Sequence, residues 1–70
     1  MSGQKFELTI NGERQVVEAS TLDAALIELG FGAAKVATAL NGDFVPAGRR
    51  GDVSLKPGDR IEIVTARQGG

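Results

Sequence analysis

The sequence predicts a two-layer α+β domain in which one helix covers one face of a mixed β-sheet of four to five strands. Runs of alternating apolar and polar residues flank two Asn-Gly pairs, at positions 11–12 and 41–42, and this is the pattern of β-hairpins. A single stretch between them, residues 22–29, has apolar side chains at helical spacing instead. A helix that connects two parts of a sheet makes a right-handed connection and packs across one face, so the order of elements favours this fold class.

The composition excludes several classes of function. The chain has 70 residues and a net charge of −1 at pH 7, with no cysteine and no histidine. It therefore makes one domain without disulfides, and it lacks both the thiolate nucleophile and the usual near-neutral general base. Balanced charge argues against nucleic-acid binding, and no apolar run is long enough for a membrane span or a signal peptide. We expect a cytoplasmic protein, monomeric when free, that binds no metal.

The chain opens with a predicted hairpin. Residues 6–10 alternate apolar and polar side chains, which indicates a half-buried strand. The Asn-Gly pair after it tolerates the positive φ angles of a tight turn, and residues 14–18 form the return strand. The return strand has a less regular pattern, which is typical of a sheet edge.

The helix prediction begins at an N-cap supplied by Ser20 or Thr21, and Asp23 follows in the first turn, where the helix dipole favours an anion. Gly30 stands where a left-handed residue ends many helices, and Phe31 after it is placed to fold back on the helix. One apolar stripe, about two and a half turns long, consists of Leu22, Ala25, Leu26 and Leu29. A helix this short needs a sheet to pack against, so the stripe is assigned to the core.

The second half of the chain predicts three more strands. Residues 36–40 form one strand, and residues 44–45 form a short edge strand that ends at Pro46. Residues 47–52 are expected to form an exposed loop with local positive charge from Arg49 and Arg50. After a turn at residues 56–59, the last strand covers residues 60–65.

The chain ends on two glycines placed directly after the predicted last strand. This order divides the chain into a β-sheet domain, residues 1–66, and a flexible C-terminal tail, residues 67–70. Glycine has no Cβ, so Gly69 and Gly70 let the backbone pass through a channel too narrow for other residues. By itself the pair has two interpretations: a reactive terminus presented by the domain, or a loose end such as a linker leaves.

Three segments carry a resemblance to a known family. They are residues 36–46 (VATALNGDFVP), residues 56–64 (KPGDRIEIV) and the terminal glycine pair. Together with the order of elements, they resemble the ThiS family over essentially the whole chain. These are the sulfur carriers of thiamine (thiazole) biosynthesis, small β-grasp proteins related to ubiquitin. The sequence departs from the family at residues 47–51, where members often carry a tryptophan and this chain has none.

The resemblance implies a function for the tail. An ATP-dependent, ubiquitin-activating-type adenylyltransferase would adenylate the Gly70 carboxylate, and sulfur from a persulfide donor would then convert it to a thiocarboxylate. Thiazole synthase would use that sulfur. ATP and magnesium belong to the activating partner, so the resemblance implies that this chain binds no cofactor and is a protein co-substrate rather than an enzyme.

The resemblance also implies roles for individual residues. Gly70 is the reacting residue, and Gly69 passes through the channel of the partner. From their positions, Arg67, Gln68 and Val64 are the candidate partner contacts, although a lone exposed arginine such as Arg67 is more often only a solvated residue. We expect docking on the sheet face opposite the helix, because Val64 alternates with the core-facing residues of the last strand. An exposed valine is also common without any function.

Other functions remain open from the sequence. One is a carrier like the small subunit of molybdopterin synthase, and a second is a ubiquitin-like modifier whose Gly70 is joined to lysines of other proteins. A third is a β-grasp binding module in which the glycines have no role.

Overall fold

The computed structural model describes residues 5–32 and 34–65, so the predicted boundary between residues 66 and 67 lies outside the described residues. Within the described part, five strands, one α-helix and one 3-10 helix follow one another along the chain. In chain order they are β1 (Phe6–Ile10), β2 (Glu13–Val17), α1 (Leu22–Glu28), β3 (Val36–Leu40), β4 (Asp43–Val45), η1 (Ala47–Asp52) and β5 (Arg60–Thr65).

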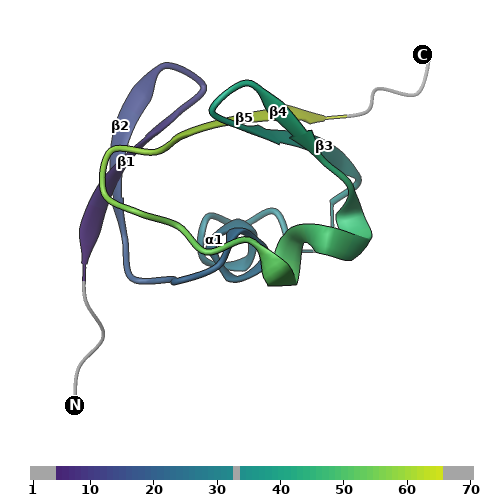
Figure 1. The fold of residues 1–70 in the computed structure, drawn as a ribbon, viewed down its shortest axis with the longest axis horizontal. Helices are drawn as coiled ribbons and strands as arrows, with labels where there is room; N and C mark the ends of the chain where they lie inside the picture. Colours follow the sequence, from purple (N-terminus) through teal and green to yellow (C-terminus); the bar gives the residue numbers. More distant parts are fainter. Residues whose placement is uncertain (1–4, 33, 66–70) are drawn as a thin grey trace.

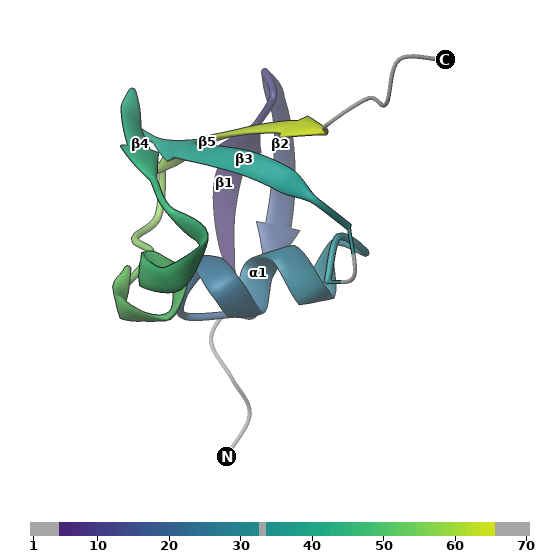
Figure 2. The same cartoon turned by 90° about the vertical axis from the view of Figure 1, so that its right-hand side faces the viewer.

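The five strands form one mixed sheet in the order β2-β1-β5-β3-β4. Only the central pair, β1 and β5, is parallel, and the register of that ladder covers two residue pairs. Figures 1 and 2 show the sheet arched over α1, with β1 and β2 crossing the direction of β3 and β5 at a steep angle. The two layers confirm the predicted α+β fold, and the strong twist between β1 and β5 explains why their ladder is short.

Both predicted Asn-Gly turns are present. Asn11 and Asn41 each have a φ of 51°, and the glycines after them have φ angles of 85° and 91°. The return strand β2 starts at Glu13, one residue earlier than predicted, because the two-residue turn places Glu13 directly opposite Ile10.

The caps of α1 agree with the sequence, although the helix is shorter than predicted. The Thr21 hydroxyl accepts the N–H of Ala24 at 3.2 Å, so Thr21 rather than Ser20 is the N-cap. At the other end Gly30 has a φ of 95°, and the Phe31 N–H donates to the Leu26 carbonyl at 2.7 Å. This is the backbone pattern of a Schellman motif, which ends the helix after seven residues.

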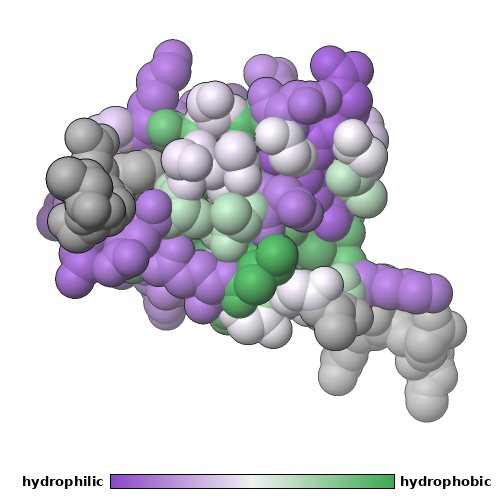
Figure 3. Space-filling model, turned by 90° about the horizontal axis from the view of Figure 1, so that it is seen from below, coloured by the Kyte–Doolittle hydropathy of each residue, from purple (hydrophilic) through white to green (hydrophobic). Residues whose placement is uncertain are grey.

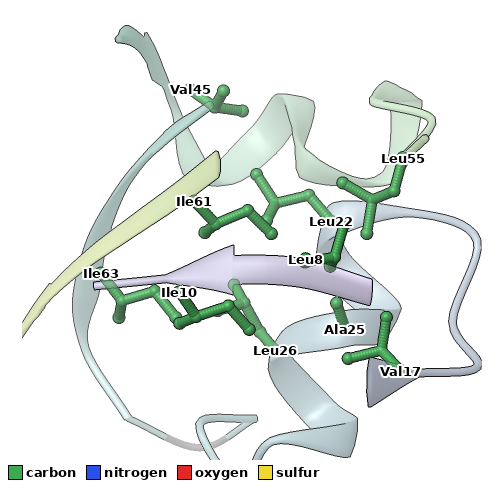
Figure 4. Packing of buried hydrophobic residues seen from close by; sticks show 10 residues of the cluster. All are labelled: Leu8, Ile10, Val17, Leu22, Ala25, Leu26, Val45, Leu55, Ile61 and Ile63. Atoms are coloured by element: carbon green, nitrogen blue, oxygen red, sulfur yellow. The ribbon is translucent and has the colours of Figure 1, made fainter. Parts of the chain in front are cut away.

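The core fills the space between the sheet and α1. Figure 4 shows side chains of β1, β5 and α1 pointing toward one another. The buried cluster consists of Leu8, Ile10, Val17, Leu22, Ala25, Leu26, Val45, Leu55, Ile61 and Ile63. Leu55 has no place in any predicted element, and it reaches the core because its N–H donates to the Ser20 carbonyl at 2.9 Å.

The expected loop at residues 47–52 is instead the 3-10 helix η1. Pro46 is its N-cap and has an extended backbone, with a φ of −64° and a ψ of 154°, so the helical conformation begins at Ala47. Arg49 is exposed as predicted, but Arg50 is half-buried and its side chain binds β3. The prediction of two solvated arginines is therefore wrong for Arg50, because the turn of η1 directs it at the sheet.

Candidate functional site

Of the candidate site residues, the structure describes only Val64. Gly70, Gly69, Arg67 and Gln68 lie outside the described residues. Val64 lies in β5 and is 64% exposed, which confirms the predicted alternation with the buried Ile61 and Ile63. The site is therefore built from β5 and the surface that surrounds its end.

Both turn asparagines hold β5 in place. The Asn11 side chain accepts the Ile63 N–H at 2.7 Å and donates to the Ile63 carbonyl at 3.0 Å. The Asn11 side chain thereby makes the two backbone hydrogen bonds that β1 would make to Ile63 if the strand continued past Ile10. The Asn41 side chain accepts the Arg60 N–H at 2.9 Å and donates to Asp59 at 3.1 Å, which fixes the start of β5.

The end of β5 pairs with β3, and Arg50 in turn holds β3 by hydrogen bonds on its other edge. Thr65, the last described residue, pairs with Val36. The Arg50 guanidinium donates to the Val36 carbonyl at 2.6 Å and to the Thr38 hydroxyl at 3.1 Å. The Thr38 hydroxyl in turn donates to the Val45 carbonyl at 3.0 Å. Arg50 therefore supplies the partner that β4 no longer provides at this position of β3.

An apolar surface lies on the outer face of the sheet beside this end of β5. The register places Phe44, Ala39 and Glu62 in one row across β4, β3 and β5, and Ala37 beside Val64 in the next row. Phe44 is 68% exposed, so large apolar side chains stand on both sides of the two small alanines. We call these five residues the outer platform.

Two shallow hollows meet at Glu62. The first, about 170 Å³, is lined by the outer platform and by Thr38. The second, about 200 Å³, is lined by Glu62, Arg60, Asn41 and Gly42. The platform thus offers a groove for an apolar side chain next to one carboxylate.

The helix side of the molecule differs from the platform. Figure 3 views the molecule from this side and shows a surface that is largely hydrophilic, with hydrophobic colour confined to small areas. Among the described residues only one large apolar side chain of α1, Ile27, is exposed to a similar degree, at 64%. Among the described residues, exposed large apolar side chains therefore lie near one another on the sheet, at Phe44 and Val64, and not on α1.

Within residues 5–32 and 34–65, no group of three or more potential metal ligands is close enough to hold an ion. Over the same part of the chain, no helix has the length and apolar character needed to cross a membrane.

Sequence reasoning missed most of the platform. The sequence predicts an edge strand at residues 44–45 but not which way Phe44 faces. Val45 is buried, and strand alternation places Phe44 on the other face. The same alternation identifies Glu62 as an outward residue between Ile61 and Ile63. No local pattern shows that these residues are neighbours, because the strand order of the sheet is what brings β4, β3 and β5 together.

A mixed sheet with its last strand in the centre, crossed by one helix, defines the β-grasp class of α+β domains. One solved structure, that of the thiamine biosynthesis protein (ThiS) from Geobacter metallireducens, superposes with a TM-score of 0.75 at 29% identity. The match covers 93% of this chain and 100% of that one.

The sequence comparisons agree. The model of the ThiS family matches residues 3–70, and the chain belongs to this family. A curated relative, the thiazole synthase of Paramagnetospirillum magneticum (strain ATCC 700264 / AMB-1), is 42% identical over 66 residues. These cover 93% of this chain, but the chain spans only 20% of the length of that relative.

Proposed function

We propose that this chain is a sulfur carrier for thiamine biosynthesis, and that the Gly70 carboxylate holds the sulfur as a thiocarboxylate. The observation that carries the proposal is the family match, which extends through residue 70 and so includes the glycine pair. The names of the solved relative and of the curated relative, a ThiS thiamine biosynthesis protein and a thiazole synthase, point to the same pathway.

The chemistry begins with activation of the carboxylate. A carboxylate is a poor electrophile because its charge is shared by two oxygens. Attack of a Gly70 oxygen on the α-phosphorus of ATP gives an acyl-adenylate and releases pyrophosphate. ATP and Mg²⁺ belong to the activating adenylyltransferase, so this chain acts as a co-substrate and not as the catalyst.

Sulfur then replaces the adenylate. The terminal sulfur of a persulfide attacks the acyl carbon, AMP leaves, and an acyl disulfide forms. A thiol reduces the sulfur–sulfur bond and leaves the thiocarboxylate on Gly70, together with a disulfide of the donor and the thiol. Thiazole synthase is the proposed acceptor of this sulfur.

The tail and the domain have separate roles in this proposal. Residues 67–70 span up to about 13–14 Å when fully extended, which is enough to enter the active site of another protein. Gly69 and Gly70 add no side chain to that passage. Arg67 and Gln68 are proposed to contact the channel of the partner, and Val64 is proposed to contact its surface.

Intact-mass measurement tests the proposal. The chain is produced together with the adenylyltransferase and a persulfide-forming sulfur donor from its source organism, and its mass is compared with that of the chain produced alone. We expect the mass gain that accompanies replacement of one oxygen by sulfur, located at Gly70 by fragmentation. Isopeptide adducts would indicate a protein modifier, and an unchanged mass would contradict the proposal.

Complementation and a source-cell control complete the experiment. A thiazole auxotroph should be rescued by the chain, whereas a mutant lacking the molybdopterin synthase small subunit should not. The mass of the protein isolated from its source cells also has to show a chain that ends at Gly70, as the carboxylate or the thiocarboxylate, because the mechanism requires a terminal carboxyl group on that residue.

A further inference from the structure

The two Asn-Gly turns are also places where a chain can modify itself. In an Asn-Gly pair, the backbone nitrogen of the glycine can attack the side-chain carbonyl carbon of the asparagine. The attack is favoured at such a pair because glycine has no Cβ to hinder the approach. The chain has two of these pairs, Asn11-Gly12 and Asn41-Gly42, and each forms a two-residue hairpin turn with positive φ angles.

The reaction is a deamidation that needs no enzyme. A bond forms between the glycine nitrogen and the asparagine Cγ, the Cγ–Nδ2 bond breaks, and ammonia leaves with the proton of the glycine N–H. The product is a cyclic succinimide. Water then breaks one of the two ring C–N bonds, which gives aspartate or isoaspartate, and neither step requires an oxidant or a reductant.

The folded chain slows this reaction at both turns, because both asparagine side chains are hydrogen-bonded. An amide whose oxygen and nitrogen both have partners must release them and rotate before its Cγ can meet the next backbone nitrogen. The rate at each turn therefore depends on how easily its asparagine leaves its partners, which is the free energy of a local opening.

The partners of Asn11 belong to the core. Its side chain bonds both backbone groups of Ile63, at 2.7 Å and 3.0 Å, and both bonds are partly buried. Ile63 is only 5% exposed. Rotation of the Asn11 amide would leave a donor and an acceptor of this buried residue unpaired, and that is costly.

The partners of Asn41 lie in contact with water. Its side chain accepts the Arg60 N–H at 2.9 Å and donates to the Asp59 carboxylate at 3.1 Å, and both bonds are exposed. Asn41 and Gly42 also line the polar hollow of about 200 Å³ together with Arg60 and Glu62. Water can replace Asn41 at both groups, so rotation of this amide costs less than rotation of the Asn11 amide.

The two hairpins also differ in the number of residue pairs behind the turn. Five pairs join β1 to β2, whereas three pairs join β3 to β4. A hairpin with fewer pairs has fewer bonds to break when its turn opens, so its turn opens more often. The length of the hairpin and the exposure of the partners therefore both favour reaction at Asn41.

We propose that Asn41-Gly42 is a site of spontaneous deamidation in the folded chain, whereas the identical pair Asn11-Gly12 is protected by its bonds to Ile63. The inference is independent of the proposed function. It assigns a modification site to the β3–β4 turn and gives the order in which two chemically identical pairs react.

Both products would change the start of β5. An aspartate at position 41 places a carboxylate oxygen where the Asn41 amide now donates to Asp59, so two anions would face each other. An isoaspartate adds one carbon to the backbone of the two-residue turn, which disturbs the pairing of Leu40 with Asp43. Either product is therefore expected to loosen the β3–β4 turn from Asp59 and Arg60.

Peptide mapping of the full chain tests the proposal. Folded protein is incubated for several weeks at mildly alkaline pH, which favours attack by the glycine nitrogen, and samples are digested and analysed by mass spectrometry. Isoaspartate is counted separately by enzymatic carboxyl methylation with labelled S-adenosylmethionine. We expect position 41 to react at least about tenfold faster than position 11, because only Asn11 has buried partners.

The unfolded chain is the matched control. In denaturant both asparagines have lost their partners and the same two residue types react, so the two rates should agree within about threefold. Equal rates in the folded chain, or a faster reaction at Asn11, would overturn the proposal. A folded chain that keeps both asparagines intact throughout the incubation would overturn it as well.

Two variants verify the assignment. Asn41→Gly removes the reactive amide and keeps an easy positive φ, so it should abolish nearly all isoaspartate. Asn11→Gly makes the same change at the other turn and should leave the yield at or above that of the wild type. Circular dichroism and the Tm verify that each variant is folded, and loss of isoaspartate in Asn11→Gly alone would contradict the assignment.

Discussion

Asn11 and Asn41 each combine a left-handed backbone conformation with side-chain hydrogen bonds to the neighbouring strand. Both occupy the left-handed region, with a φ of 51°, and both direct a side-chain amide at the backbone of β5. Asparagine tolerates this backbone conformation better than other residues with a Cβ. Two hairpin turns, far apart in the sequence, therefore hold the same strand.

Replacement of Asn11 by Gly or Ala should separate these two properties. Asn11→Gly removes the two hydrogen bonds to Ile63 but keeps an easy positive φ, so we expect a loss of about 1–2 kcal/mol in the free energy of unfolding. Asn11→Ala adds the cost of a left-handed alanine, about 1 kcal/mol more. Urea denaturation of both variants measures the losses, and equal values would show that the backbone conformation contributes nothing.

Strand β3 depends on a side chain where its neighbour ends. Pro46 follows the last residue of β4, and η1 begins immediately after it, so the first residues of β3 have no strand on that side. Arg50 occupies the position and binds the Val36 carbonyl. An arginine at this place also closes an open strand edge to other chains.

The two neighbouring arginines of η1 should differ in their effect on stability. Arg50→Ala loses its bonds to Val36 and Thr38, for which we expect a loss of about 1–2 kcal/mol in the free energy of unfolding. Arg49→Ala breaks only a 3.5 Å pair with Asp52 between side chains that are more than 70% exposed. Its loss should stay below about 0.5 kcal/mol. Chemical denaturation compares the two variants, and similar losses would contradict a bracing role for Arg50.

Stability and proposed reactivity lie in different parts of the molecule. Every buried apolar residue of the described core lies between Leu8 and Ile63, and the sheet and α1 account for nearly all of them. The proposed reaction takes place at Gly70. Substitutions can therefore change the stability of the domain and the proposed reaction at Gly70 independently of each other.

Deletion of Gly70 tests this separation. The free energy of unfolding should remain within about 0.5 kcal/mol of wild type, because the deletion leaves every residue of the described core unchanged. Formation of the thiocarboxylate should be abolished, since a carboxylate one residue earlier falls short of the adenylation site. Thermal denaturation and intact mass of the same sample measure both effects, and a clear fall in Tm would mean that Gly70 contributes to the fold.

Much of the fold follows from local sequence patterns. The strands at residues 6–10, 36–40 and 60–65 have the predicted bounds, and the Asn-Gly turns and the Gly30 helix end are present as predicted. Steric rules for each residue and its near neighbours determine these features. The predicted family is also confirmed, whereas the proposed tail residues lie outside the described part of the chain.

Local patterns determined the strands, the Asn-Gly turns and the ends of α1, because alternation and turn chemistry act over a few residues. The resemblance to the ThiS family came from three segments of the sequence together with the order of elements. Only the packed molecule decided the strand order β2-β1-β5-β3-β4, the inward turn of Arg50 and the meeting of Phe44, Glu62 and Val64 on one surface. These features join residues that are distant in the chain, and the burial of one common core selects their arrangement.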